Sequence, residues 1–343
     1  MGRNHQAFQD HTRLNTERTG MMKIDIHAHI VDRSYIARLE LHGSMTRIAE
    51  DGKTFLKRDG DTSVWWREDM FDVDARLSEM DRLGIDIRIL SLSTPNVYEW
   101  TGAEQVHVAR DMNDRLADMC AAHPDRFLGL ASLPLDDVDA ALEELDRAIG
   151  KLNLKGVALG SNIAGEHLDA DRFEPFWERL NALKVPVFMH PMFPPPSKAM
   201  SGFELPLRLG LPFDTTLAAT RLIYSGVLER YPDVVLILAH TGGTLIPLLK
   251  RLDNGFRIFP ECRKYITQLP SVIAKQLYYD TASFSPELLA MAINSVGVSQ
   301  ILFATDDPYI GANTEHVEAL DISDADKAAI FGGNAKRLLR LDA

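Results

Sequence analysis

The chain has 343 residues, of which 45% are hydrophobic and 25% charged, so it can bury a large core, and disorder is not expected outside the ends. The 49 acidic residues outnumber the 37 basic ones, and the net charge of -12 disfavours nucleic acid and anionic membranes as partners. Cys120 and Cys262 form no CxxC motif, and no run of about 18 apolar residues occurs. We therefore expect a cytoplasmic protein without disulfides and without a membrane span.

The chain divides into a polar N-terminal end and one long globular part. Residues 1–21 lack the apolar segment of a signal peptide, and we predict that they form a mobile tail. Residues 22–343 contain eight short apolar runs of the kind expected for strands buried on both faces. The predicted strands are Lys23–Ile30, Ile87–Ser93, Phe127–Pro134, Lys155–Gly160, Pro186–Pro191, Val234–His240, Leu277–Ala282 and Ile301–Asp306.

The stretches between these strands have helical periodicity, as in Val138–Leu152, where apolar residues line one face and charges the other. Eight strands that alternate with helices predict an α/β protein with a single (β/α)8 barrel, also called a TIM barrel. A doubly wound open sheet is the competing architecture.

Two stretches are too long or too irregular for simple barrel loops. Residues 31–74 lie between the first and second strands and include Trp65, Trp66 and Arg67, so we predict an inserted lobe over the barrel mouth. Residues 192–212 are rich in proline and glycine, which predicts irregular structure after the fifth strand.

The first strand carries His27 and His29 two residues apart near its end. Because side chains alternate along a strand, both imidazoles are expected on the same, interior side of the barrel, where both can reach one ion. Taken alone, this pair is as compatible with ordinary hydrogen bonding as with metal binding.

Three more candidate ligands end three other predicted strands. His190 ends the fifth strand, His240 the sixth and Asp306 the eighth. The carboxyl ends of barrel strands meet at one mouth, so these side chains are predicted to converge with His27 and His29. Asp307 is expected to point the opposite way from Asp306. The remaining histidines are expected at the surface; they are His5, His11, His42, His107, His123, His167 and His316.

This constellation resembles the amidohydrolase superfamily, which has HxH on strand one, histidines on strands five and six, and aspartate on strand eight. The resemblance covers about residues 22 to 340. Binuclear members carry a bridging lysine at the end of strand four, whereas here that strand reads KGVALGSN, with Lys155 at its start. The resemblance therefore implies one divalent metal held by His27, His29, His190 and Asp306.

Within the superfamily, the chain is most similar to the branch of aminocarboxymuconate semialdehyde, resorcylate and carboxyvanillate decarboxylases. Segments such as LSEMDRLGIDIRILS, SGVLERYPDVVLILAHTGG and GNAKRLLRL carry the likeness. Several aromatic-acid decarboxylases replace the first histidine of HxH by glutamate, so His27 favours the aminocarboxymuconate type, although the loop after His190 has no tryptophan, which that enzyme is expected to have. The resemblance also implies a homodimer in which Arg251 binds the substrate carboxylate across the interface, with Arg67 as a second candidate.

Three imidazoles and one carboxylate suit zinc, with manganese as the alternative, and leave room for a water molecule whose pKa the metal lowers. His240 is assigned to proton transfer, because the ordinary pKa of histidine lies near ~6.5, and Asp306 assists it. The expected function is non-oxidative decarboxylation of a small unsaturated or aromatic carboxylic acid. A hydrolase or hydratase of a lactone or unsaturated dicarboxylic acid is the alternative, and a non-catalytic metal-binding or ligand-binding barrel is the remote one.

Overall fold

The computed structural model describes residues 21–42, 45–58, 60–193 and 200–341. The predicted tail, residues 1–21, lies outside this part of the chain except for Met21. Eight parallel strands form the central sheet: β1 (Ile24–Ile30), β5 (Ile87–Leu92), β6 (Phe127–Ser132), β7 (Gly156–Gly160), β10 (Pro186–His190), β11 (Val235–Leu238), β12 (Tyr278–Asp280) and β13 (Ile301–Leu302).

The sheet closes on itself. Neighbouring strands pair in chain order from β1 to β13, and the segment from β13 onward returns to β1. Ile26 donates its amide to the Phe303 carbonyl at 3.0 Å, and Asp306 donates its amide to the His27 carbonyl at 2.8 Å. The predicted (β/α)8 barrel is confirmed, and the open sheet is excluded.

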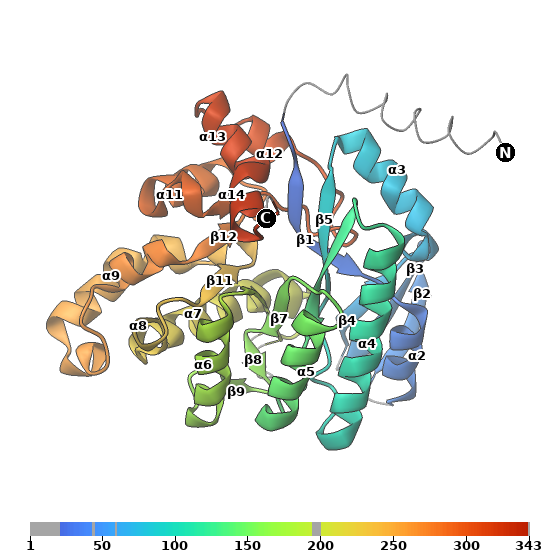
Figure 1. The fold of residues 1–343 in the computed structure, drawn as a ribbon, viewed down its shortest axis with the longest axis horizontal. Coiled ribbons are helices and arrows are strands. Elements are labelled where there is room, and N and C mark those ends of the chain that lie inside the picture. Colours follow the sequence, from blue (N-terminus) through green and yellow to red (C-terminus); the bar gives the residue numbers. More distant parts are fainter. Residues whose placement is uncertain (1–20, 43–44, 59, 194–199, 342–343) are drawn as a thin grey trace.

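Helices surround the strands (Figure 1). The longer ones are α3 (Val73–Leu83), α4 (Gly102–Ala122), α5 (Val138–Gly150), α6 (Glu174–Leu183), α7 (Leu211–Tyr224), α9 (Leu245–Ile258) and α11 (Pro286–Val296). Shorter ones are α8 (Val227–Arg230), α10 (Pro270–Ile273), α12 (Glu315–Glu318), α13 (Asp324–Ala328) and α14 (Asn334–Leu338). Helix α9 projects from one side of the molecule.

Two apolar layers hold the barrel together. Ile24, Ile89 and Phe188 belong to a cluster of side chains from the barrel strands that fills the interior. A larger cluster, which includes Leu90 and Leu145, lies between the strands and the helices. Because alternate residues of a strand face opposite sides, each strand contributes to both layers, and this accounts for its continuous apolar sequence.

The chain between β1 and β5 folds as helix α2 (Arg33–Leu41) followed by a small antiparallel sheet of β2 (Thr46–Glu50), β3 (Lys53–Arg58) and β4 (Asp61–Trp66). Glu204, from the segment after β10, accepts hydrogen bonds from Lys57 Nζ and the Thr62 amide, both at 2.8 Å. The insertion is thereby joined to the chain that leaves the fifth barrel strand.

The prediction of irregular structure for residues 192–212 is wrong for its last part. Residues Pro206–Gly210 form one turn of π-helix, and α7 starts at Leu211. Pro206 lies in the first turn of this helical segment, where proline is tolerated because its missing N–H has no helical partner. Pro212 follows at the start of α7, directly after the π-helical turn. Residues 194–199 lie outside the described part of the chain.

Candidate metal centre and active site

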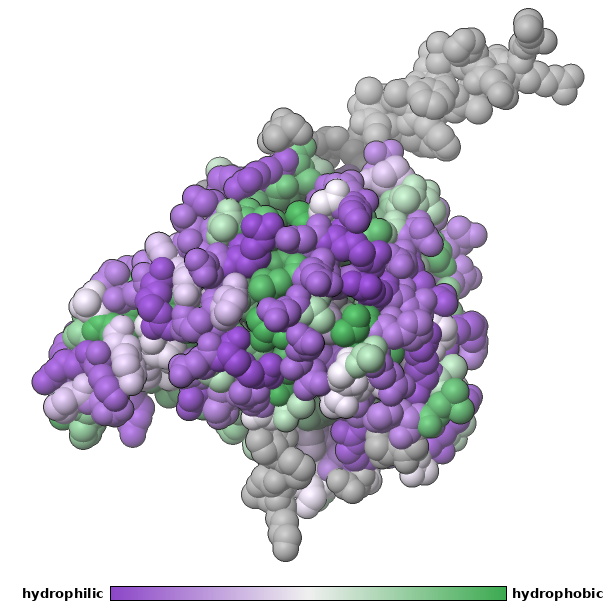
Figure 2. Space-filling view, turned by 60° about the horizontal axis from the view of Figure 1, so that its bottom comes forward, coloured by the Kyte–Doolittle hydropathy of each residue, from purple (hydrophilic) through white to green (hydrophobic). Residues whose placement is uncertain are grey.

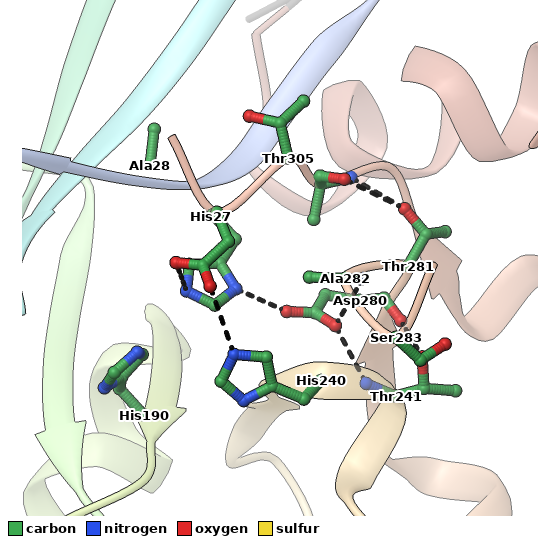
Figure 3. A network of polar contacts seen from close by, with 12 residues as sticks. His27, Ala28, His190, His240, Thr241, Asp280, Thr281, Ala282, Ser283 and Thr305 are labelled. Carbon is green, nitrogen blue, oxygen red and sulfur yellow. Dashed lines mark hydrogen bonds and ion pairs between the residues drawn. The ribbon is translucent and has the colours of Figure 1, made fainter. Parts of the chain in front are cut away.

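The five side chains predicted to converge do meet at the carboxyl ends of the strands. His27 and His29 come from β1, His190 ends β10, and His240 and Asp306 lie shortly after the ends of β11 and β13. His27, His190 and His240 point toward one another (Figure 3). The ligand atoms of His27, His190, His240 and Asp306 all lie within 4.8 Å of one another.

A bulge in β1 brings His27 into this group. Ile24 and Ile26 belong to the interior cluster, so strict alternation would turn His27 outward. The register with β5 instead runs from Asp25 opposite Arg88 to Ala28 opposite Leu90, which gives β1 one extra residue. At this bulge the alternation of side chains between the two faces of β1 is interrupted, so His27 also faces the interior. Its ring lies 4.8 Å from that of Phe188.

The three predicted histidine ligands share one arrangement of hydrogen bonds. His27 Nδ1 faces Asp280 Oδ2 at 2.7 Å, and His190 Nδ1 faces the Pro191 carbonyl at 3.1 Å. His29 Nδ1 lies 3.2 Å from Ser91 Oγ. With a proton on each Nδ1, the lone pair of each Nε2 is free, which is the tautomer that a metal ligand requires.

The spacing of the inward atoms fits one small cation. His27 Nε2 and His29 Nε2 are 3.1 Å apart, and they lie 3.3 Å and 3.2 Å from Asp306 Oδ1. Two atoms that each bind one ion at about 2.1 Å are about 3.0 Å apart at a right angle and about 3.4 Å apart at a tetrahedral angle. The donor set therefore fits a single divalent metal ion.

The electrostatics of the cluster also favour a positive charge. Burial opposes protonation of His27, but Asp306 and Asp280 outweigh it and raise the pKa of His27 to about 10 in the metal-free protein. Burial likewise opposes ionisation of Asp306, yet the charge of His27 and hydrogen bonds from His240, His27 and His29 hold the pKa of Asp306 well below its usual range. Burial and the neighbouring histidines lower the pKa of His190 well below its ordinary value, so His190 stays neutral.

His240 is held differently from the other histidines. Its Nε2 lies 3.5 Å from Asp306 Oδ2, and its buried Nδ1 has no hydrogen-bond partner among the described residues. His240 and Asp306 both have a φ of 54°, a left-handed conformation that costs about 1–3 kcal/mol at a residue other than glycine. Such strain is characteristic of functional positions, and here it turns both side chains toward the same centre.

The two predicted arginines lie outside this cluster. Arg67 pairs with Asp69 at 3.0 Å and stacks over the Trp65 ring at 5.7 Å. Arg251 is exposed on α9, where it lines a groove between α7 and α9. Within this one chain, neither guanidinium is brought to the histidines and Asp306.

Several residues of the site were missed by sequence reasoning. Asp280 ends the seventh strand in the same way that His190 ends the fifth, so its position in an apolar run was an available signal. The prediction that His316 lies at the surface is wrong, because it is 4% exposed and its Nε2 lies 2.9 Å from Thr281 Oγ1, behind Asp280. No local pattern indicated that Tyr309 would pack beside His29, or Trp65 beside Tyr309.

Comparison with known proteins identifies the family. The amidohydrolase family profile matches residues 24–341, nearly the whole chain. The chain belongs to the amidohydrolase family. It is 32% identical to gamma-resorcylate decarboxylase of Rhizobium sp. (strain MTP-10005), over 89% of this chain and 98% of that protein. It is 29% identical to 2-amino-3-carboxymuconate-6-semialdehyde decarboxylase of Dictyostelium discoideum, over 94% and 92% of the two chains.

The fold of this amidohydrolase also matches solved structures. The crystal structure of dihydroxybenzoic acid decarboxylase from Polaromonas sp. JS666, with bound manganese and the inhibitor 2-nitroresorcinol, superimposes with a TM-score of 0.78 and 28% identity, and the match covers 94% of this chain and 98% of that one. The predicted branch of the superfamily is thus confirmed, and the predicted enzyme class, a metal-dependent carboxy-lyase, agrees with these relatives.

Proposed function

We propose that this metal-dependent decarboxylase removes carbon dioxide without oxidation from a small aromatic or unsaturated carboxylic acid. The observation that carries the proposal is the cluster of His27, His190, His240 and Asp306 at the barrel mouth, together with His29, whose Nε2 lies 3.1 Å from His27 Nε2. The named relatives are decarboxylases of acids of this kind.

The chemistry requires a proton at the carbon that bears the carboxylate, followed by cleavage of the bond to that carboxylate. The electron pair of the broken bond returns to the substrate as carbon dioxide leaves. His240 is suited to deliver the proton, since an imidazole can both donate and accept one and its Nε2 lies 3.5 Å from Asp306 Oδ2 at the barrel mouth. A bound divalent ion would supply positive charge that polarises the substrate oxygens. Asp280 and Asp306 hold the surrounding histidines in place.

An aromatic surface borders the site and supports a flat substrate. The Tyr309 ring lies 5.5 Å from the His29 ring, and the Trp65 ring lies 5.7 Å from the Tyr309 ring. Trp65 belongs to β4 of the insertion, so residues 31–74 contribute to the proposed binding site. Offset and edge contacts between aromatic rings contribute about 0.5–1.5 kcal/mol per pair. Arg67, stacked on Trp65, remains the proposed carboxylate contact on this side.

For the metal we propose zinc, with manganese as the alternative. Imidazole-rich sites with a carboxylate suit zinc, whereas the solved relative from Polaromonas holds manganese. The proposed ligands are His27, His29, His190 and Asp306, with His240 reserved for proton transfer.

We further propose a homodimer whose interface contains Arg251. Apolar side chains that are 44% to 65% exposed gather beside it on α7, α9 and the residue that follows α9; they are Phe213, Leu217, Ile258 and Phe259. All four line, with Arg251, an open groove of about 710 Å³. In the space-filling view, the part of the molecule that projects at the left is mostly hydrophilic, with a few apolar side chains among the polar ones (Figure 2). Exposed apolar areas of this kind are typical of protein interfaces.

We also propose the domain organisation and the cellular location that the sequence predicts. We propose that residues 22–343 fold as one domain, because Leu56, Val64 and Trp66 of the insertion belong to the same buried cluster as Leu90 of the barrel. None of the helices in the described part of the chain has the length and apolar character of a membrane span. Cys120 and Cys262 are unpaired, which supports a reducing, cytoplasmic location.

Metal analysis of the purified protein, coupled to a carbon dioxide release screen, tests the proposal. The screen covers hydroxybenzoates and aminomuconate-type acids, with lactones and unsaturated dicarboxylic acids as substrates for the alternative reaction. We expect one divalent ion per chain and carbon dioxide release from at least one acid. Turnover of a lactone or unsaturated diacid without carbon dioxide would instead establish the hydrolase or hydratase. Bound metal without turnover of any compound would support a non-catalytic metal-binding or ligand-binding barrel.

A further inference from the structure

A buried group of four charged residues lies on the outer side of the barrel wall, behind the metal centre. Asp25 and Arg88 face each other across β1 and β5, Arg76 comes from α3, and Asp307 follows Asp306. Each of the four is at most 7% exposed. We call this group, Asp25, Arg76, Arg88 and Asp307, the outer charge cluster.

Asp25 connects the two segments that carry metal ligands. Its Oδ1 accepts the amide of His27 at 3.2 Å and the amide of Thr305 at 3.0 Å. Its Oδ2 accepts the Thr305 hydroxyl at 2.6 Å. The residue thus bonds to His27 at the bulge of β1 and to the neighbour of Asp306, so it fixes the positions of the two backbones relative to each other.

Asp307 holds the other flank of Asp306. Arg76 Nη2 donates to Asp307 Oδ2 at 2.8 Å, and Arg88 Nη1 lies 3.0 Å from the same oxygen. Arg88 also reaches Asp25, with its Nε 3.2 Å from Oδ2. Asp306, whose φ is 54°, therefore lies between Thr305, which is bonded to Asp25, and Asp307, which is paired with the two arginines. Arg88 contacts both Asp25 and Asp307.

The cluster is poorly arranged for stability. In the described structure, Arg76 Nε and Arg88 Nη2 are buried without a hydrogen-bond partner. Burial of two ion pairs costs desolvation free energy that is recovered only when every polar atom is bonded, and apolar replacements are often as stable. A structural role alone therefore explains the cluster less well than a role in orienting its neighbours.

We propose that the outer charge cluster positions His27 and Asp306 and thereby sets the affinity and geometry of the metal centre. The four residues are positioning residues, because they touch the ligands' backbones and neighbours rather than the reacting atoms. This inference rests on the proposed metal site. Outer partners of metal ligands typically change metal affinity by about 10–100-fold when they are mutated.

The test uses the charge-balanced double variant Arg76→Met with Asp307→Asn, which removes the ion pairs of Asp307 with Arg76 and Arg88 and leaves Asp25 and Arg88 paired. Manganese affinity is measured by chelator competition, ligand geometry by the visible spectrum of the cobalt(II) form, and folding by the melting temperature of the metal-free protein. We expect manganese to bind about 10–100-fold more weakly and the cobalt spectrum to change. The matched control is Glu144→Gln with Arg147→Met, a pair on α5 with a buried carboxylate, 2.8 Å apart. The control should bind manganese as the wild type does.

Unchanged affinity and an unchanged cobalt spectrum in the folded double variant would overturn the proposal. If that variant does not fold, Thr305→Val provides the test, because it removes only the 2.6 Å hydrogen bond to Asp25 and no charge. The Thr305→Val protein should bind manganese several-fold more weakly, and wild-type affinity would overturn the proposal equally. A wild-type protein that binds no divalent metal would refute the metal site itself, whereas metal binding without decarboxylation would refute only the proposed reaction.

Discussion

Replacement of Asp280 by asparagine tests whether the Asp280 carboxylate decides which ring nitrogen of His27 carries the proton when His27 is neutral, as metal binding requires. Asp280 Oδ1 accepts the amides of Thr241 and Ala282 at 2.8 Å and 3.0 Å, while Oδ2 faces His27 Nδ1 at 2.7 Å (Figure 3). An asparagine here has one oxygen and one NH2 group to offer, and it can take either of two orientations.

The two orientations differ in the number of donors left unpaired. If the NH2 group faced Thr241 and Ala282, two buried amides would lose their acceptor, at about 1–3 kcal/mol each. If the oxygen stays with those amides, the NH2 group faces His27 Nδ1, which then accepts a hydrogen bond and carries no proton. The second orientation is favoured, and it moves the proton of neutral His27 to Nε2, the atom that faces Asp306 and His29.

Asp280→Asn should therefore weaken manganese binding by about 10–100-fold, or about 1.4–2.7 kcal/mol, because His27 loses its inward lone pair and the site loses a negative charge. Chelator competition at neutral pH measures the affinity. The control is Asp253→Asn, a buried carboxylate that bonds Ser271 away from the histidines and should leave affinity unchanged. Metal affinity within about threefold of wild type in the folded Asp280→Asn protein would refute the assigned tautomer.

Four further outcomes are expected. His240→Ala should keep its metal but lower kcat by about 10²–10⁴-fold, as determined by metal analysis and carbon dioxide release, and unchanged turnover would exclude His240 as the proton-transfer residue. Removal of the metal by a chelator should abolish turnover. Manganese added back at about 100 times its Kd should raise the free energy of unfolding by about 2.7 kcal/mol in denaturant titrations. A denaturation curve that manganese does not shift would contradict binding to the folded state. Burial lowers the pKa of His316 from 6.5 to about 4, so the unfolded chain binds more protons between these values and stability falls as pH drops from 6.5 to 4. The loss of unfolding free energy amounts to about 3 kcal/mol. In metal-free protein, His316→Gln should therefore make the free energy of unfolding less dependent on pH over this window than in the wild type. The same pH dependence in both proteins would argue against a neutral buried imidazole. Trp65→Ala should raise KM for aromatic acids about tenfold with a smaller change in kcat, and an effect confined to kcat would argue against Trp65 as a binding surface.

The sequence by itself determined the barrel and the side chains that gather at its mouth as candidate ligands. Strand alternation has a period of two residues and is local, so His27 and His29 could be placed on one side of β1 from their spacing. His190, His240 and Asp306 each follow an apolar run, and the carboxyl ends of parallel strands share one mouth, which brings these residues together whatever the details of the helices. The expectation that Asp307 points away from Asp306 is confirmed by its pairs with Arg76 and Arg88.

Only the tertiary structure decided how those ligands are held. Asp280 lies 253 residues from His27 in the chain, and their contact depends on barrel closure rather than on local pattern. The bulge in β1 changes which residues face inward, and no hydrophobic period signals one extra residue in a strand. Burial of His316, the contact of Tyr309 with His29, and the outer charge cluster likewise arise from segments far apart in sequence. Periodicity shows which way a side chain faces relative to its neighbours, whereas its partners are set by how distant elements pack.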